Sequence, residues 1–185
     1  MLHSFRSMFV RLCAGLTMAI TVTIAGGAPR QLPEFTHRGA ADWLNSAPLT
    51  TAGARGRPVL VEVWAFGCSN CLASLPWMHA IARRYRPRGL VIIGVHTPEL
   101  ADEYQPSAVR AAVGRLHIDY PVMIDADYSY WSALGNHYWP AFYLYDGRGQ
   151  LIGTHVGELH VGEPRSDAFE LLLASSLSDA ARLDH

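Results

Sequence analysis

The sequence of 185 residues contains no lysine, so every cation other than histidine is an arginine. It also carries little net charge, with 15 arginines against 16 acids and a formal charge of -1. A protein that binds nucleic acid needs an excess of cations to neutralise phosphates, so this balance argues against a nucleic-acid partner. The three cysteines include a single CxxC, and the chain shows no internal repeat. Half of the residues are apolar, which is enough for the core of one domain.

The N-terminal residues 1–28 have the pattern of a secretory signal peptide. Arg6 and Arg11 form a basic region, residues 12–25 are mostly apolar and uncharged, and the small residues 26–28 suit a cleavage site. The apolar run is short for a membrane span, which needs about 20 residues, but an uncleaved anchor remains the alternative. Export would place the protein in an oxidising compartment and leave two cysteines that can pair only with each other.

The rest of the chain predicts strands alternating with helices. We expect an irregular lead-in over residues 29–57 with a short helical turn near 42–45, a domain over 58–178, and a tail over 179–185. Strand formers predict strands at 58–65, 90–95, 120–125, 141–145 and 151–156, and apolar spacing predicts helices at 69–85, 107–116, 128–134 and 166–177. This order implies an α/β fold with a mixed sheet between helices.

The CxxC motif lies at a predicted junction between a strand and a helix, at Cys68 and Cys71. The helix begins at or just after Cys68, so this sulfur lies near unpaired backbone N–H groups and the positive end of the helix dipole. Both features stabilise a thiolate, which is the nucleophile of disulfide exchange. Cys71 lies one turn later on the same face, close enough to form a ring with Cys68. The spacing favours attack by Cys68 and resolution by Cys71.

Two other uses of the cysteine pair have to be weighed. A metal site needs further ligands; no second CxxC follows, but a copper or zinc site stays open through the scattered histidines His96, His137, His155 and His160. A purely structural bridge is disfavoured, because so short a loop removes little chain entropy from the unfolded state.

The segment VLVEVWAFGCSNCLASLP resembles the active-site region of thioredoxin-fold proteins. Glu62 lies six residues before the first cysteine and Trp64 four before it, where that family keeps a buried acid and a tryptophan. Pro76 lies five residues after the second cysteine and matches the proline of the family's helix. The segment WPAFYLYDGRGQLIGTHVG resembles the family's cis-proline strand and hairpin, which places Pro140 at the cis-proline.

The resemblance narrows to the redoxin, TlpA-like branch, because a helix and a strand are inserted between residues 105 and 125. The segments CSNC, VIIGVHTPE, YPVMIDADYSYW, GNHYWPAFYLYD and GELHVGE together resemble the exported thioredoxin-like domain of DipZ-type thiol:disulfide interchange proteins, over roughly residues 33–175. This implies a thioredoxin-like three-layer α/β/α sandwich with a mixed central sheet and an inserted helix-strand unit. The chain departs from the thioredoxin pattern at Gly67, where tryptophan is usual, and in the Ser-Asn pair between the cysteines.

Glu62 is the predicted general base for the Cys71 proton, acting through water. It sits mid-strand among valines, where a buried carboxyl tends to have a raised pKa, although a carboxylate that reaches solvent is the alternative. The lysine partner that thioredoxins supply to the buried acid is absent, because the chain has no lysine.

The predicted substrate-binding residues surround the cysteines. A cis bond before Pro140 would present the backbone of Trp139 to an extended substrate strand, with Trp139 as an apolar wall over the sulfurs. Phe66 and His96 follow the ends of their predicted strands, where Phe66 packs around the site. His96 is a candidate to line the cleft, and a solvent-exposed or capping histidine is the alternative.

The sequence therefore predicts an exported thiol:disulfide oxidoreductase with no metal and no cofactor besides a redox-active Cys68–Cys71 disulfide. Its expected partners are cysteine-containing exported proteins and a membrane thiol-electron carrier. Its expected location is periplasmic or otherwise extracytoplasmic. The alternative is an exported metal-binding chaperone that uses the CxxC and a histidine.

Overall fold

A computed structural model describes residues 31–183, and the predicted signal peptide at 1–28 lies outside the described residues. The strands are β1 (Trp43–Leu44), β2 (Val59–Trp64), β3 (Val91–His96), β4 (Val122–Ile124), β5 (Ala141–Tyr145) and β6 (Leu151–Val156). The α-helices are α1 (Thr51–Ala54), α2 (Ser69–Tyr85), α3 (Pro106–Arg115), α4 (Ser129–Leu134) and α5 (Pro164–Leu183). The 3-10 turns are η1 (Ala40–Asp42), η2 (Arg86–Arg88) and η3 (Ala101–Tyr104).

The strands form one mixed sheet in the order β1-β4-β3-β2-β5-β6. β2 runs parallel to β3, which runs parallel to β4, whereas β5 pairs antiparallel with both β2 and β6. Every residue of β2 and β3 is buried, as expected for central strands that are covered on both faces.

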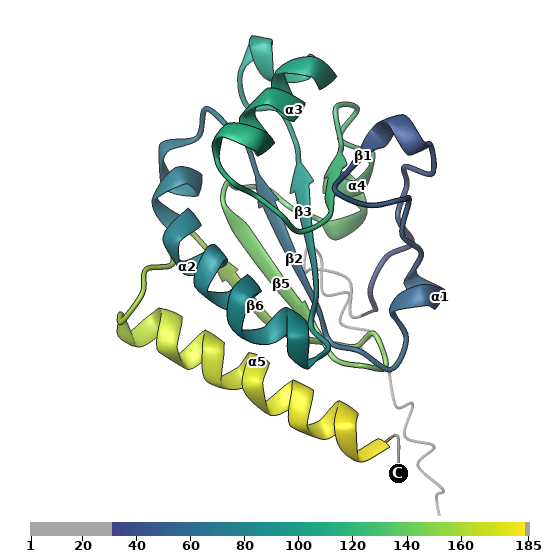
Figure 1. Ribbon diagram of the computed structural model, residues 1–185, viewed down its shortest axis with the longest axis vertical. Coiled ribbons are helices and arrows are strands. Elements are labelled where there is room, and N and C mark those ends of the chain that lie inside the picture. The colour runs from purple at the N-terminus through teal and green to yellow at the C-terminus, as the bar shows by residue number, and fades with distance from the viewer. Residues whose placement is uncertain (1–30, 184–185) are drawn as a thin grey trace, which may run out of the picture.

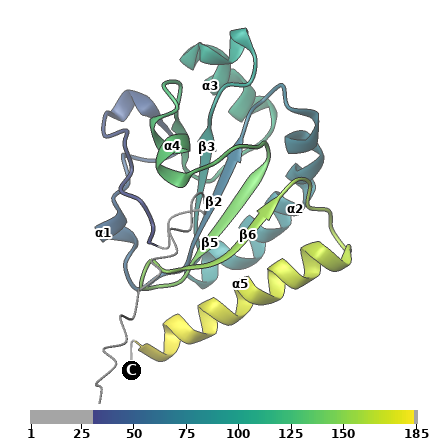
Figure 2. The same ribbon diagram turned by 180° about the vertical axis from the view of Figure 1, so that it is seen from behind.

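Helices cover both faces of the sheet, with α2 and α5 on one side and α1 and α4 on the other (Figures 1 and 2). Side chains alternate along each strand, so that Leu60 and Ile92 join the core under α2 and α5, while Val61 and Ile93 join the core under α4. The predicted three-layer α/β/α sandwich is confirmed, and α3 with β4 forms the predicted inserted unit.

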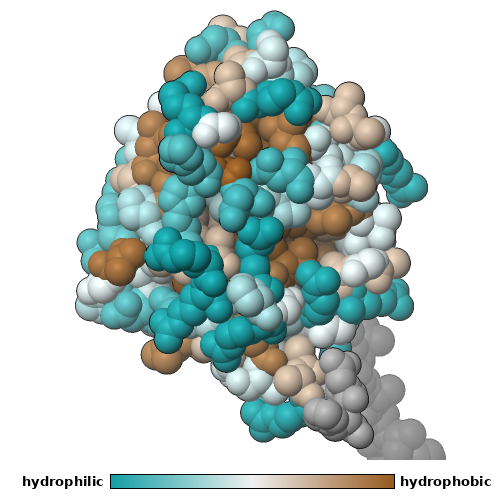
Figure 3. Space-filling view, in the orientation of Figure 1, coloured by the Kyte–Doolittle hydropathy of each residue, from teal (hydrophilic) through white to brown (hydrophobic). Residues whose placement is uncertain are grey.

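The outer surface of the α2 and α5 face is mainly hydrophilic, with separate apolar patches (Figure 3). None of the helices within residues 31–183 combines the length and the apolar character that crossing a bilayer requires.

Two segments differ from the prediction. After the η1 turn, Trp43 and Leu44 form the edge strand β1, which pairs with β4 instead of being irregular or helical. Two residues carry no detectable periodicity, so this strand exists because of its partner. The last helix, α5, continues through Leu183 instead of ending at 177, and Arg182 pairs with Asp179 in the extended turn.

Ser74 anchors the N-terminal half of α2 to the end of the sheet. Its buried hydroxyl donates to the Asn70 carbonyl at 3.0 Å and accepts the backbone N–H of Leu159 at 3.1 Å. Because Leu159 follows β6, this contact fixes the CxxC turn of α2 relative to the antiparallel edge of the sheet.

Candidate active site

The two cysteines form a disulfide at the start of α2, with their Cα atoms 5.3 Å apart. Cys68 occupies the N-cap position, and its Sγ accepts the backbone N–H of Cys71 at 3.2 Å. Cys68 is 7% exposed and Cys71 only 1% exposed. A partner can therefore reach Cys68 more readily than Cys71, and the predicted pairing of the two residues is confirmed.

Gly67, the first departure from the thioredoxin pattern, has a steric explanation. A Cβ atom at this position would lie 2.8 Å from Leu100 Cδ1 and 3.1 Å from Glu103 Oε1. The η3 turn therefore occupies the space in which a side chain at position 67 would lie. The η3 turn and the glycine next to the nucleophile are two parts of one local structure.

Glu103 holds this arrangement together, although it was not among the predicted site residues. Its fully buried carboxylate accepts the backbone N–H of Gly67 at 2.5 Å through Oε1, and those of Glu99 and Leu100 at 2.6 and 2.7 Å through Oε2. The sequence does signal the bond to Leu100. Leu100 immediately precedes η3, and a glutamate three residues after such a capping position can accept the backbone N–H of that position. The bond to Gly67 carries no sequence signal, because 36 residues separate the partners.

Glu62 lies in the middle of β2 and is 1% exposed, so the predicted burial is confirmed and a solvent-reaching carboxylate is excluded. Burial raises the pKa of Glu62 to about 7, and a hydrogen bond from the Tyr120 hydroxyl to Oε2, at 2.8 Å, partly opposes this rise. Leu60 and Trp64, two residues to either side of Glu62 in the strand, face the core under α2, and Glu62 shares their face. The same core contains Cys68 and Cys71.

The peptide bond between Trp139 and Pro140 is cis, as predicted. Trp139 and Phe66 are partly buried and pack against the core that contains both cysteines. The Trp139 ring is held on its other side by Trp131, with ring centroids 4.2 Å apart, and its Nε1–H donates to the Thr97 carbonyl at 3.0 Å. The Trp139 and Phe66 side chains therefore remain candidates for contact with a substrate.

His96 does not lie open to a substrate, contrary to the prediction. It is the last residue of β3 and has no exposed surface. Its ring stacks on Phe66, and its Nε2 accepts the Phe66 backbone N–H at 3.3 Å. Burial lowers the pKa of His96 to about 4, although the charge of nearby Glu103 opposes this shift. His96 therefore acts as a neutral support beneath Phe66.

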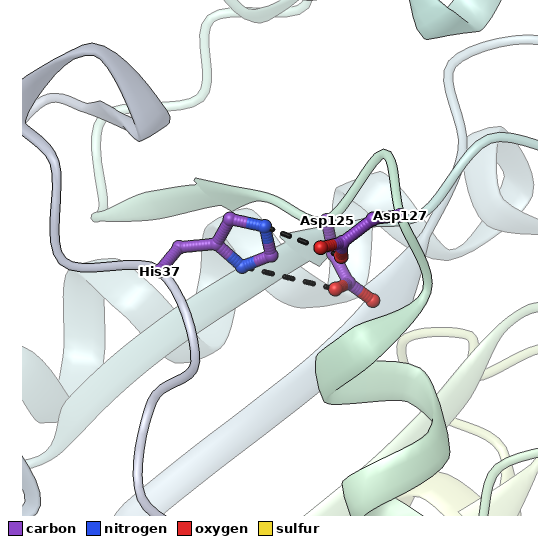
Figure 4. A group of neighbouring side chains, drawn as sticks. All are labelled: His37, Asp125 and Asp127. Atoms are coloured by element: carbon purple, nitrogen blue, oxygen red, sulfur yellow. Dashed lines mark ion pairs between the residues drawn. The ribbon is translucent and has the colours of Figure 1, made fainter.

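The predicted alternative, a metal site with a histidine, gains no ligand set in the described part of the chain. His155 Nε2 lies 3.1 Å from the Glu158 carbonyl, and His160 Nε2 lies 2.7 Å from the Glu158 carboxylate. Within residues 31–183, the only group of three suitable ligands is His37, Asp125 and Asp127, which includes neither cysteine (Figure 4).

That group has a structural explanation. Asp125 accepts the backbone N–H groups of Tyr130 and Trp131, each at 2.9 Å, and the Thr97 hydroxyl at 3.1 Å. His37 Nδ1 lies 3.8 Å from Asp125 Oδ1, and His37 Nε2 lies 3.3 Å from Asp127 Oδ1. His37 therefore connects the segment before η1 to the start of α4. The cluster fastens the lead-in to the sheet edge.

The geometry can support disulfide exchange. It provides a sulfur at a helix N-terminus, a second sulfur one turn deeper, and a buried carboxyl on the same side of the sheet whose pKa lies near neutrality. A group with such a pKa can both take and return a proton at physiological pH.

Comparison with known proteins gives a consistent family. The Redoxin family model matches residues 28–172. Protein DipZ of Mycobacterium tuberculosis is 36% identical over 146 residues, which cover 77% of this chain and 20% of DipZ. The thiol-disulfide oxidoreductase YkuV of Bacillus subtilis is 28% identical, over 68% of this chain and 83% of YkuV. This chain therefore spans only about one fifth of the length of the DipZ proteins.

The fold agrees with these matches. A thiol:disulfide interchange protein DsbE from Chlorobium tepidum superposes with a TM-score of 0.67 at 20% identity, covering 84% of this chain and 99% of that one.

Proposed function

The chain belongs to the redoxin family and carries its thiol:disulfide oxidoreductase chemistry in the Cys68–Cys71 pair, and from this premise we propose that it exchanges disulfides with cysteine-containing proteins outside the cytoplasm. A membrane thiol carrier restores its redox state after each cycle. The observation that carries the proposal is the asymmetry of the pair, in which Cys68 is the more exposed sulfur at the helix N-cap and Cys71 is buried.

In the reducing direction, the Cys68 thiolate attacks a substrate disulfide, and one substrate sulfur leaves as a thiolate. A mixed disulfide now joins Cys68 to the other substrate sulfur. Glu62 accepts the Cys71 proton through water, and the Cys71 thiolate attacks the Cys68 sulfur. The second substrate sulfur leaves, so the substrate gains two electrons and the cysteine pair ends as a disulfide. The reverse sequence oxidises a substrate dithiol.

Phe66 and Trp139 contribute the apolar part of the substrate surface, because both are partly exposed and pack on the core around the cysteines. The Trp139 backbone pairs with an extended substrate segment as a short added strand. The extracytoplasmic location is supported by the signal-peptide pattern of residues 1–28.

The proposal is tested by trapping in the native host. Full-length Cys71→Ser, with a C-terminal tag, is expected to accumulate mixed disulfides with exported proteins, because nothing resolves the bond at Cys68. The complexes should be found in the extracytoplasmic fraction, and the trapped chain should begin near residue 29. Non-reducing electrophoresis and mass spectrometry after thiol quenching identify the partners.

Cys68→Ser is the matched control and should trap few partners, since the buried Cys71 is left alone. Equal trapping by both variants, or complexes confined to the cytoplasm, would contradict the proposal. Metal analysis of the reduced wild type and of Cys71→Ser decides the alternative, because a metal-binding chaperone would hold metal that the variant loses.

A further inference from the structure

Two fully buried side chains from distant parts of the chain meet beneath α2. The Tyr120 hydroxyl donates to Glu62 Oε2 at 2.8 Å, and 58 residues separate the two in sequence. Tyr120 is 0% exposed and Glu62 is 1% exposed. Among the described residues, nothing hydrogen-bonds the other carboxyl oxygen, Oε1. Tyr120 therefore hydrogen-bonds one carboxyl oxygen of Glu62, Oε2, and the other, Oε1, can still accept a hydrogen bond.

The strand register explains how Tyr120 reaches Glu62 across an intervening strand. Glu62 pairs with Gly94 of β3, and Gly94 pairs with Val122 of β4. Tyr120 precedes Val122 by two residues and therefore projects to the same face of the sheet. Its ring passes over Gly94, where an added Cβ would lie 3.0 Å from Trp64 Nε1, 3.2 Å from Tyr120 Cε2 and 3.4 Å from Val122 Cγ2. The absence of a side chain at Gly94 makes the path for the tyrosine.

The strands on either side of β2 place no charged side chain against Glu62. β5 presents Phe142 opposite Glu62, and β3 presents His96 two residues beyond Gly94. Burial lowers the pKa of His96 to about 4, so its ring is neutral at physiological pH. From α2, the cysteines share the same core. The whole sequence contains no lysine that could pair with the acid.

We propose that Tyr120 is the positioning residue for Glu62: its hydroxyl fixes Oε2 and leaves Oε1 as the acceptor for the Cys71 proton. The proposal rests on the function proposed above. An uncharged donor orients a buried carboxyl without the strong stabilisation of the ionised form that a cation would bring. The acid can therefore accept a proton near neutral pH and return it in the reverse reaction, which suits an exchange that runs in both directions.

The test is a Tyr120→Phe variant, which removes the hydroxyl and keeps the ring over Gly94. The primary measurement is the titration of the Glu62 carboxyl carbon by NMR in the oxidised protein, where the cysteines do not titrate. Loss of one hydrogen bond to the charged form should move the midpoint upward by about one pH unit. The pH profile of mixed-disulfide resolution should move in the same direction by a similar amount.

Tyr145→Phe is the matched control. Tyr145 is also fully buried, but its hydroxyl has no partner among the described residues and its ring lies in the core on the opposite face of the sheet. This substitution should leave both midpoints unchanged. An unmoved Glu62 midpoint in Tyr120→Phe, or equal shifts in both variants, would overturn the inference.

A Gly94→Ala variant provides a second route if Tyr120→Phe does not fold. The added methyl would lie 3.0 Å from Trp64 Nε1 and 3.2 Å from Tyr120 Cε2, so it should displace both rings and raise the Glu62 midpoint. An unchanged midpoint would again overturn the inference. The titration also separates this inference from the proposed function. A shifted midpoint in a protein that exchanges no disulfides would leave the positioning role standing and refute the function.

Discussion

Two buried glutamates lie near the cysteines, and their surroundings differ. Glu103, in the η3 turn, satisfies three backbone N–H groups with its two oxygens. Glu62, in the central strand β2, accepts one hydrogen bond, from the Tyr120 hydroxyl to Oε2, and its Oε1 has no partner among the described residues. Burial of a polar group is costly unless it is hydrogen-bonded, so the first carboxyl stabilises the fold and the second weakens it. The contrast separates a structural acid from an acid that is available for proton transfer.

The largest expected effect comes from removing the structural acid. Glu103→Ala leaves three backbone donors without their acceptor: the N–H of Gly67 before α2 and those of Glu99 and Leu100 at the start of η3. The variant should lower the free energy of unfolding by about 3–4 kcal/mol at neutral pH. Chemical denaturation measures this loss. Glu99→Ala is the matched control, because the Glu99 side chain is exposed. A loss no greater than that of the control would remove the distinction between the two acids.

Glu62→Gln, unlike Glu103→Ala, should raise the free energy of unfolding above neutral pH. The folded pKa of Glu62 is about 7 against an ordinary value of 4.5, so the folded state binds more protons than the unfolded state between these two pH values. Wild-type stability therefore falls as pH rises through this window, and the full cost above pH 7 is about 3 kcal/mol. Glutamine has no charge to bury, so the variant should avoid this loss.

The measurement is the difference in unfolding free energy between wild type and Glu62→Gln at several pH values. The difference should be small at pH 4 and should favour the variant at pH 8. His96 contributes its own pH dependence to both proteins, so the difference isolates Glu62. A variant that is less stable than wild type at pH 8 would mean that the carboxylate is satisfied, as in Glu103.

The smallest effect is expected at Gly67, where the η3 turn contacts the residue that precedes Cys68. The methyl of Gly67→Ala would press against Leu100 and the Glu103 carboxylate, at a cost of about 1–2 kcal/mol. Gly114→Ala is the control: it lies in α3 with nothing within 4 Å of an added Cβ, so it should be neutral or stabilising. If both variants gain stability in thermal unfolding, the turn does not clamp this position.

Local sequence features determined much of this protein. The apolar runs at β2 and β3, the helical spacing of α2, and the hairpin of β5 and β6 were readable because their periodicity lies within one element. The position of Cys68 at the helix start followed from the same boundary. The resemblance to thioredoxin-fold proteins supplied Glu62 as the buried acid and the cis bond before Pro140, and both agree with the structure.

Tertiary structure alone decided the contacts that join distant segments. Tyr120 reaches Glu62 only because β4, β3 and β2 align Val122, Gly94 and Glu62 in one row. Glu103 reaches Gly67 only because the η3 turn packs on the loop before Cys68. The two-residue strand β1 forms because β4 offers it a partner. No pattern in the sequence records such pairings, because each depends on where the folded sheet places residues far apart along the chain, whereas periodicity records only which face of its own element a residue occupies.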